Sequence, residues 1–160
     1  MLVGFGYDVH RLAPGRPCIL GGVRIPHERG LLGHSDADVL VHAVMDAILG
    51  AIGQRDIGQH FPNTDPRYEG ADSLALLRLV VGLAGESGCR VRNLDSTVVA
   101  EEPMLAPHVE GMKRNLAEAL GLSAGRVAVK ATTNEGLGFI GAREGIAAFA
   151  VVSVEESEPA

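Results

Sequence analysis

Apolar and polar residues follow two different periods along this chain. Short apolar stretches bounded by glycine, proline and other turn residues predict β-strands, and Gly21-Gly22 suits a tight hairpin turn between two of them. Longer stretches with apolar residues every three to four positions predict helices. We expect strands at 2–11, 17–21, 23–26, 92–100, 126–132 and 145–155, and helices at 36–52, 72–86 and 107–120.

Residues that suit helix ends flank each helical stretch, because side-chain oxygens cap the first turn and glycine ends the last one. The expected boundary residues are Ser35 or Asp36 and Gly53 for the first, Asp72 or Ser73 for the second, and Pro107 and Gly121 for the third. The element order then predicts an α+β fold, a two-layer sandwich in which helices lie on one face of a mixed β-sheet. We expect one domain over 1–156 and a flexible acidic tail at 157–160.

Two histidines and an aspartate form the most informative pattern. Asp8 and His10 point the same way because strand side chains alternate faces, and His42 lies in the first helix. One carboxylate and two imidazoles with a fourth position open are typical of a catalytic zinc site. Asp38 and Asp46 share a helical stripe with His42, so either could orient its ring. The alternative is a core histidine with both aspartates facing solvent.

Three loops carry further candidate chemistry. The strand that ends in Thr132-Thr133 runs into a glycine-bearing loop that could hold phosphate oxygens, with Glu135 as a ligand for Mg²⁺ or Mn²⁺. The segment 56–66 could form a substrate wall, and 100–107 could surround a base or ring. The alternatives are ordinary turns and a strand-to-helix connection. We expect His27 and His108 to be surface residues without a functional partner.

Composition narrows the function classes. Apolar residues make up 46% of the 160 residues and aromatic residues only 4%, with no Trp, so the core must be aliphatic. The net charge of −6 argues against a nucleic-acid partner. Apolar runs fall short of the ~20 residues that a membrane helix needs, so we expect no membrane association. Cys18 and Cys89 are too few for a disulfide framework, which favours reduced thiols and a cytoplasmic protein.

Six segments together resemble the 2-C-methyl-D-erythritol 2,4-cyclodiphosphate synthase family of the non-mevalonate isoprenoid pathway. They are GYDVHRL, ILGGVRIP, GLLGHSDADVLVHAVMDAILGA, DIGQHFPNTDP, VKATTNEGLGFIG and EGIA, and they span nearly the whole chain in the family's order. The resemblance implies a homotrimer with its sheets facing the centre and active sites between subunits. It also implies that 4-diphosphocytidyl-2-C-methyl-D-erythritol 2-phosphate is cyclised, with release of CMP, by attack of the 2-phosphate on the β-phosphorus.

The same resemblance assigns residues to roles. It implies Zn²⁺ on Asp8, His10 and His42, and Mg²⁺ or Mn²⁺ bridging the diphosphate with Glu135 as a ligand. His34 and Thr133 would be the catalytic residues that stabilise the transition state. The implied substrate-binding residues are Asp8, His10, His34, Ser35, Asp56, Ile57, Gly58, Phe61, Pro62, Asn63, Thr64, Asp65, Ala100, Pro103, Met104, Leu105, Ala106, Thr132, Thr133, Asn134, Glu135 and Phe139.

Three positions depart from the family pattern. Asn63 replaces the usual Asp, which alters charge but keeps hydrogen-bonding capacity. Met104 replaces a Lys that would contact phosphate. Ala142-Arg143 stands where the family has Arg-Gly, so the Arg is shifted by one position and on a strand would face the other way. We therefore do not expect the regulation by isoprenoid diphosphates that has been proposed for the family's central cavity.

Two other functions stay open on the residues alone. A zinc hydrolase on the same scaffold would use metal-bound water as its nucleophile, and product analysis would reveal simple hydrolysis. A non-catalytic trimer that binds a nucleotide or an isoprenoid diphosphate would show no turnover.

Overall fold

The computed structural model describes residues 1–156, so the expected tail at 157–160 lies outside the described residues. Its strands are β1 (Leu2–Pro14), β2 (Cys18–Leu20), β3 (Val23–Ile25), β4 (Arg29–Leu31), β5 (Cys89–Val99), β6 (Val127–Thr132) and β7 (Gly145–Glu156). Its α-helices are α1 (Val39–Ala51), α2 (Ile57–His60), α3 (Ser73–Glu86), α4 (Val109–Leu120) and α5 (Gly138–Gly141). Short 3₁₀ turns cover Pro66–Tyr68, Ala106–His108 and Ala124–Arg126.

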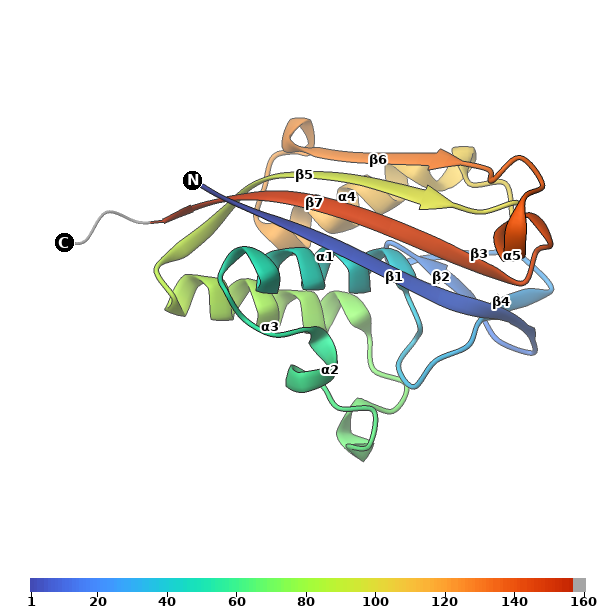
Figure 1. Cartoon of the computed structure of the whole chain (residues 1–160), viewed down its shortest axis with the longest axis horizontal. Helices are drawn as coiled ribbons and strands as arrows, with labels where there is room; N and C mark the ends of the chain where they lie inside the picture. The colour runs from blue at the N-terminus through green and yellow to red at the C-terminus, as the bar shows by residue number, and fades with distance from the viewer. Residues whose placement is uncertain (157–160) are drawn as a thin grey trace.

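The main sheet has the strand order β4-β1-β7-β5-β6 (Figure 1). β1 pairs antiparallel with both β4 and β7, and β7 pairs antiparallel with β5. β5 and β6 run parallel, with α4 in the connection between them, so the sheet is mixed as the sequence predicted. β2 and β3 form the expected separate hairpin, joined at Gly21-Gly22.

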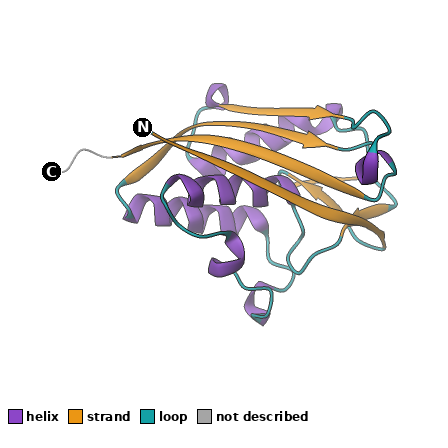
Figure 2. Cartoon of the chain, viewed as in Figure 1, coloured by secondary structure: helices purple, strands orange, loops and turns teal. Residues whose placement is uncertain are grey.

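Helices α1, α3 and α4 lie on one face of the sheet, which confirms the predicted two-layer architecture (Figure 2). α1 packs against β1 at a backbone distance that only glycine permits. A Cβ atom on Gly4 would lie 1.8 Å from the carbonyl oxygen of Ala47, and one on Gly6 would lie 1.9 Å from that of Ala43. This close approach sets the position of α1, which carries His42, relative to the strand that carries Asp8 and His10.

The opposite face of the sheet is apolar and exposed in the single chain. Alternate residues of β1 point there, as strand geometry requires. Tyr7 packs against Phe149 of β7 with ring centroids 5.0 Å apart. The large apolar side chains exposed on β1 and β7 are Val3, Phe5, Tyr7, Val9, Phe149 and Val151.

The structure corrects the start of the first helix. α1 begins at Val39 with Asp38 as its N-cap, whereas the sequence had favoured Ser35 or Asp36. The Asp38 carboxylate accepts hydrogen bonds from the backbone N–H groups of Val41, Gly21 and Gly22. It therefore caps α1 and fastens the β2–β3 hairpin at once, and it is fully buried. Burial raises the pKa of Asp38 to about 6, although the backbone hydrogen bonds oppose this.

Other boundaries follow the sequence more closely. Asp72 caps α3 with its side chain, and Gly121 ends α4 in the left-handed conformation with φ +65°. β4 is not among the expected strands, and it pairs through Leu31 with Leu12 of β1. The segment 56–66, expected as a loop, contains α2, and a 3₁₀ turn begins at its last residue.

Candidate metal centre and adjoining pocket

Asp8, His10 and His42 converge at one end of α1, as the sequence predicted. Nε2 of His10 lies 2.9 Å from Oδ2 of Asp8, and Nδ1 of His42 lies 3.1 Å from the same oxygen. The two imidazole nitrogens are 3.2 Å apart. All three potential ligand atoms lie within 4.8 Å of one another, so one metal ion can be bound by the three of them.

The ring of His10 is oriented by a backbone carbonyl. Its Nδ1 lies 2.8 Å from the carbonyl oxygen of Leu32. A carbonyl can only accept, so Nδ1 carries a proton, and Nε2 is the nitrogen that faces Asp8 and His42 and is available to a metal ion. His10 can therefore bind a metal through Nε2 without changing its tautomer.

Hydroxyl groups face the ring of His42, and the expectation of an aspartate there is wrong. Nε2 of His42 lies 3.0 Å from Oγ of Ser73 and 3.2 Å from Oγ of Ser35. The carboxylate of Asp46 instead accepts from the backbone N–H of Ile57 at 2.8 Å, and that of Asp38 caps α1. Both aspartates thus have structural partners of their own.

The electrostatics of the triad suit a divalent cation. Burial by itself would raise the pKa of Asp8, but hydrogen bonds and charge from His10 and His42 outweigh it and lower that pKa to about 2. Burial would lower the pKa of His10, and Asp8 reverses the direction so that it is raised. An ionised carboxylate with two convergent imidazole nitrogens is a donor set that fits Zn²⁺. Three protein ligands leave room for a further ligand from the adjoining pocket.

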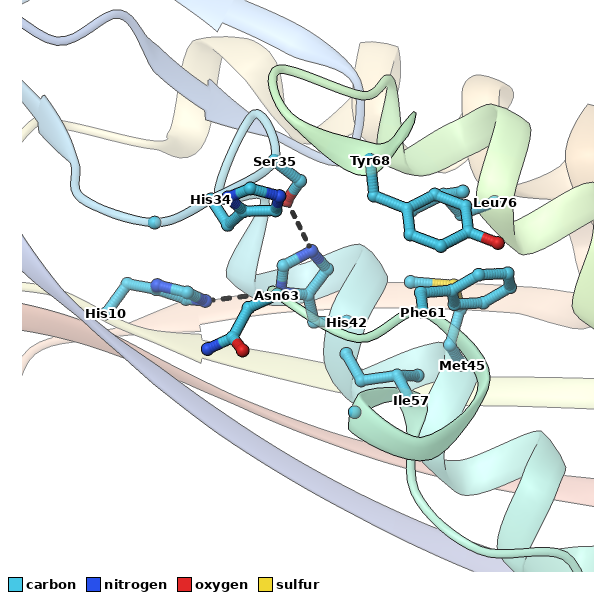
Figure 3. A pocket seen from close by; sticks show the side chains of 12 residues that line it. His10, His34, Ser35, His42, Met45, Ile57, Phe61, Asn63, Tyr68 and Leu76 are labelled. Atoms are coloured by element: carbon cyan, nitrogen blue, oxygen red, sulfur yellow. Dashed lines mark hydrogen bonds between the residues drawn. The ribbon is translucent and has the colours of Figure 1, made fainter. Parts of the chain in front are cut away.

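That pocket has a volume of about 350 Å³ and extends from the two histidines. His10, His34, Ser35, His42 and Asn63 form its polar end, which Figure 3 shows on the side of the metal ligands. Its apolar end is formed by Met45, Ile57, Phe61, Tyr68 and Leu76. The pocket thus combines a metal centre, polar groups and an apolar wall.

The pocket collects many of the residues expected to bind substrate, but not all of the 56–65 loop. His34, Ser35, Ile57, Gly58, Phe61 and Asn63 line it. Asp56, Pro62, Thr64 and Asp65 lie in the same loop outside the lining. The carboxylate of Asp65 is hydrogen-bonded by Arg67, which lowers its pKa, and its backbone oxygen lies 3.2 Å from Nε2 of His34.

The residues expected to surround a nucleobase gather in a second cavity of about 310 Å³. Its lining is Ala100, Glu101, Pro103, Met104, Leu105, Ala106, Ala131, Thr132 and Thr133. It shares no lining residue with the pocket at the metal centre. Asn134 and Glu135 are exposed beside it, and Phe139 lines a third cavity together with His10. A single chain therefore holds the two predicted halves of the substrate site apart.

Arg16 is a residue that sequence reasoning missed. Its guanidinium donates to the carbonyl oxygens of Leu31, Gly33 and Ser35, at 3.1, 3.2 and 3.1 Å. It thereby fixes the segment whose Leu32 carbonyl orients His10 and whose Ser35 faces His42. An arginine in a turn between strands gives no sequence signal for such a role.

Two neighbouring glutamates anchor the second cavity. An oxygen of the Glu101 carboxylate accepts from the backbone N–H groups of Asn134 and Gly136, at 2.9 and 3.0 Å, and so holds the loop that carries Glu135. Glu102 contacts Arg29 and lies 3.3 Å from Nε2 of His27. The His27 side chain is therefore largely buried beside Glu102, contrary to the expectation of a surface residue, while its Nε2 makes no hydrogen bond within the described residues.

Arg143 does not lie on a strand, contrary to the expectation from its shifted position. It lies in the turn before β7 with φ +61°, and its Nη1 is 3.6 Å from Glu102. Its direction is therefore set by the turn and by Glu102, and strand alternation does not apply to it.

Comparison with known proteins decides the family. The sequence profile of the YgbB family matches residues 1–155. The chain belongs to the YgbB family.

Named relatives of this YgbB family member match nearly the whole of this chain. A 2-C-methyl-D-erythritol 2,4-cyclodiphosphate synthase from Symbiobacterium thermophilum is 61% identical over 154 residues, which cover 96% of this chain and 98% of the relative. The bifunctional IspDF of Campylobacter jejuni superposes with a TM-score of 0.93 at 42% identity, over 97% of this chain but only 42% of that longer protein. A solved synthase in a form bound to CDP gives a TM-score of 0.88 at 37% identity, covering 96% and 99% of the two chains.

Proposed function

We propose that this protein converts 4-diphosphocytidyl-2-C-methyl-D-erythritol 2-phosphate to 2-C-methyl-D-erythritol 2,4-cyclodiphosphate and CMP, in the non-mevalonate isoprenoid pathway. The observation that carries the proposal is the donor set of Asp8, His10 and His42, two of which line a pocket with a polar and an apolar end. The curated relatives near 60% identity bear the name of this synthase. The enzyme is accordingly a phosphorus–oxygen lyase.

The reaction needs positioning and charge stabilisation more than proton transfer. The attacking 2-phosphate is already anionic, so no general base is required. Bound to Asp8, His10 and His42, Zn²⁺ would supply Lewis-acid stabilisation of negative charge on phosphate oxygens. His34, at the polar end of the pocket, is suited to stabilise the same charge. The apolar wall that includes Phe61 excludes water around the methylerythritol group.

The second cavity supplies the nucleotide half of the proposed site. Backbone and side-chain groups of 100–106 would surround the cytidine, and Thr132 and Thr133 would contact its phosphates. Glu135 would provide a carboxylate ligand for Mg²⁺ or Mn²⁺, ions that prefer oxygen ligands. Glu101 supports this role because it holds the backbone on both sides of Glu135.

A homotrimer explains why the two cavities are separate within one chain. If the sheets face the centre, the second cavity of one subunit can meet the metal centre of its neighbour. The exposed apolar face of β1 and β7 supports this arrangement, since contiguous apolar patches of this kind mark interaction surfaces. Phe5 and Val3 are 62% and 68% exposed in the single chain, and burying them would favour assembly.

We place the enzyme in the cytoplasm as a single domain over 1–156. Cys18 and Cys89 are both free and buried, which is compatible with a reducing compartment. Within the described part of the chain, no helix combines the length and apolarity needed to cross a membrane.

The decisive experiment measures the products formed by purified protein with Zn²⁺ and Mg²⁺. We expect CMP and cyclic diphosphate in equal amounts, lost in His42→Ala. Release of a linear hydrolysis product would indicate a zinc hydrolase instead. No turnover by folded, zinc-loaded protein would overturn the proposal and favour a binding protein.

A further inference from the structure

The ring of His42, unlike that of His10, has no backbone carbonyl as a partner that would fix its tautomer within the described residues. Nε2 of His42 faces two hydroxyl oxygens, those of Ser73 and Ser35. A hydroxyl can donate or accept, so proximity alone does not say which nitrogen of His42 carries the proton. Nδ1 of His42 faces the Asp8 carboxylate at 3.1 Å, so a metal ion bound there takes the place of any proton on Nδ1. The other partners of each serine decide whether Nε2 keeps a proton in that metal-bound state.

The hydroxyl proton of Ser73 is donated to Asp36 and not to His42. Its hydroxyl donates to Oδ1 of Asp36, and its backbone N–H donates to Oδ2 of the same carboxylate at 3.0 Å. An ionised carboxylate can only accept, so the single hydroxyl proton of Ser73 points at Asp36. Oγ of Ser73 is then left as an acceptor toward His42, and Nε2 of His42 must carry the proton.

Asp36 is itself held in place. Its Oδ1 accepts from the backbone N–H of Asp38 at 3.1 Å, and its own N–H donates to the carbonyl of Ala71 at 3.1 Å. Ser73 is fully buried at the first residue of α3. The arrangement therefore has little freedom to reverse its hydrogen bonds.

The hydroxyl proton of Ser35 is not held by a carboxylate among the described residues. Its Oγ accepts from the backbone N–H of Ala37 at 3.2 Å, and no carboxylate is among its described hydrogen-bond partners. Its hydroxyl can rotate to suit either tautomer of His42. Of the two serines, only Ser73 determines the direction of its hydrogen bond with Nε2 of His42.

We propose that Ser73 is a positioning residue for the metal centre. The chain of hydrogen bonds from His42 Nε2–H to Ser73 Oγ–H to Asp36 fixes the tautomer in which Nδ1 of His42 offers its lone pair to the metal. It also ties the start of α3 to the ligands on β1 and α1. The inference concerns metal binding and does not depend on which reaction the site performs.

The test compares serine-to-alanine variants of the full chain by zinc affinity, measured in competition with a chromophoric chelator. We expect Ser73→Ala to bind zinc roughly 10- to 100-fold more weakly than wild type, the usual effect of removing a partner of a metal-bound histidine. Ser96→Ala is the matched control. Ser96 is equally buried, and its hydroxyl donates to the carbonyl of Ala128 in the sheet, so zinc affinity should not change.

A second measurement needs no variant. Proton–nitrogen correlation spectra of isotope-labelled, zinc-loaded wild type should show His42 protonated at Nε2 and metal-bound through Nδ1. Zinc binding through Nε2 would overturn the proposal. So would wild-type zinc affinity in Ser73→Ala, or an equal loss in Ser35→Ala. Absence of CMP release would refute the proposed reaction while leaving these zinc and spectroscopic results untouched.

Discussion

The α-carbon of Gly6 lies directly against the carbonyl of Ala43, the residue after the metal ligand His42. A Cβ atom at position 6 would come within 1.9 Å of that oxygen. Because Gly6 is two residues before Asp8 on β1, this contact sets how closely the strand ligands approach the helix ligand. The geometry of the metal centre thus depends on glycine, which has no Cβ, at position 6.

Gly6→Ala should therefore weaken both folding and zinc binding. The added methyl group must push α1 away from β1, at a cost of about 1–3 kcal/mol or more in the free energy of unfolding. Gly50→Ala is the control, since a Cβ on this α1 residue meets nothing closer than 4.0 Å. The control should be neutral or more stable by about 0.5–1 kcal/mol. Urea unfolding and chelator competition test this, and equal zinc affinity in the two variants would contradict it.

Arg16→Met should loosen the segment that orients His10 and Ser35. Methionine is long enough to fill the space but donates no hydrogen bonds, so the carbonyls of Leu31 and Gly33 lose a charged donor. We expect a loss of about 1–3 kcal/mol in stability and weaker zinc binding. Arg24→Met, at an exposed arginine of β3, should change neither quantity. Faster proteolysis of Arg16→Met, but not of Arg24→Met, within the segment that Arg16 contacts would show that this segment has loosened. Identical behaviour of both variants would refute the prediction.

The contribution of Asp38 to the stability of the metal-free protein should fall as pH rises from about 4 to about 6. Burial raises the folded-state pKa of Asp38 from 3.8 to about 6. The folded state then binds more protons than the unfolded state in this range, so its advantage is lost as the carboxyl ionises. Denaturant unfolding across this range should show that the difference in stability between wild type and Asp38→Asn changes with pH, with wild type losing relative to the variant as pH rises. Parallel pH profiles would show that Asp38 does not contribute.

Met104→Lys should improve substrate binding if the second cavity receives the nucleotide. Met104 lines that cavity and is 77% exposed, so a lysine there can remain hydrated and still reach a phosphate. An exposed charge contact contributes up to about 1 kcal/mol, so we expect KM to fall up to about fivefold with kcat little changed. Leu79→Lys, which adds the same charge on α3 outside that cavity, should leave KM unchanged. An equal fall in both variants would indicate a general charge effect.

Features that depend on contacts within a few residues could be predicted from the sequence. Strand alternation placed Asp8 and His10 on one face, and the Asp72 cap and the Gly121 stop were found because both act on backbone groups within a few residues. The same logic failed for Arg143, because the turn before β7 replaces the strand on which the expectation depended.

The tertiary structure decided the rest, because long-range contacts leave no periodic signal. Sequence spacing suggested Asp38 and Asp46 as partners of His42, yet in the fold they bond the β2–β3 hairpin and α2. Ser73, itself bonded to Asp36, contacts the imidazole instead. Packing also directed Arg16 to three carbonyls and kept the two cavities apart. The sequence by itself determined which groups could bind a metal. Only folding, through the close approach of Gly6 to α1, determined that they meet and in which orientation.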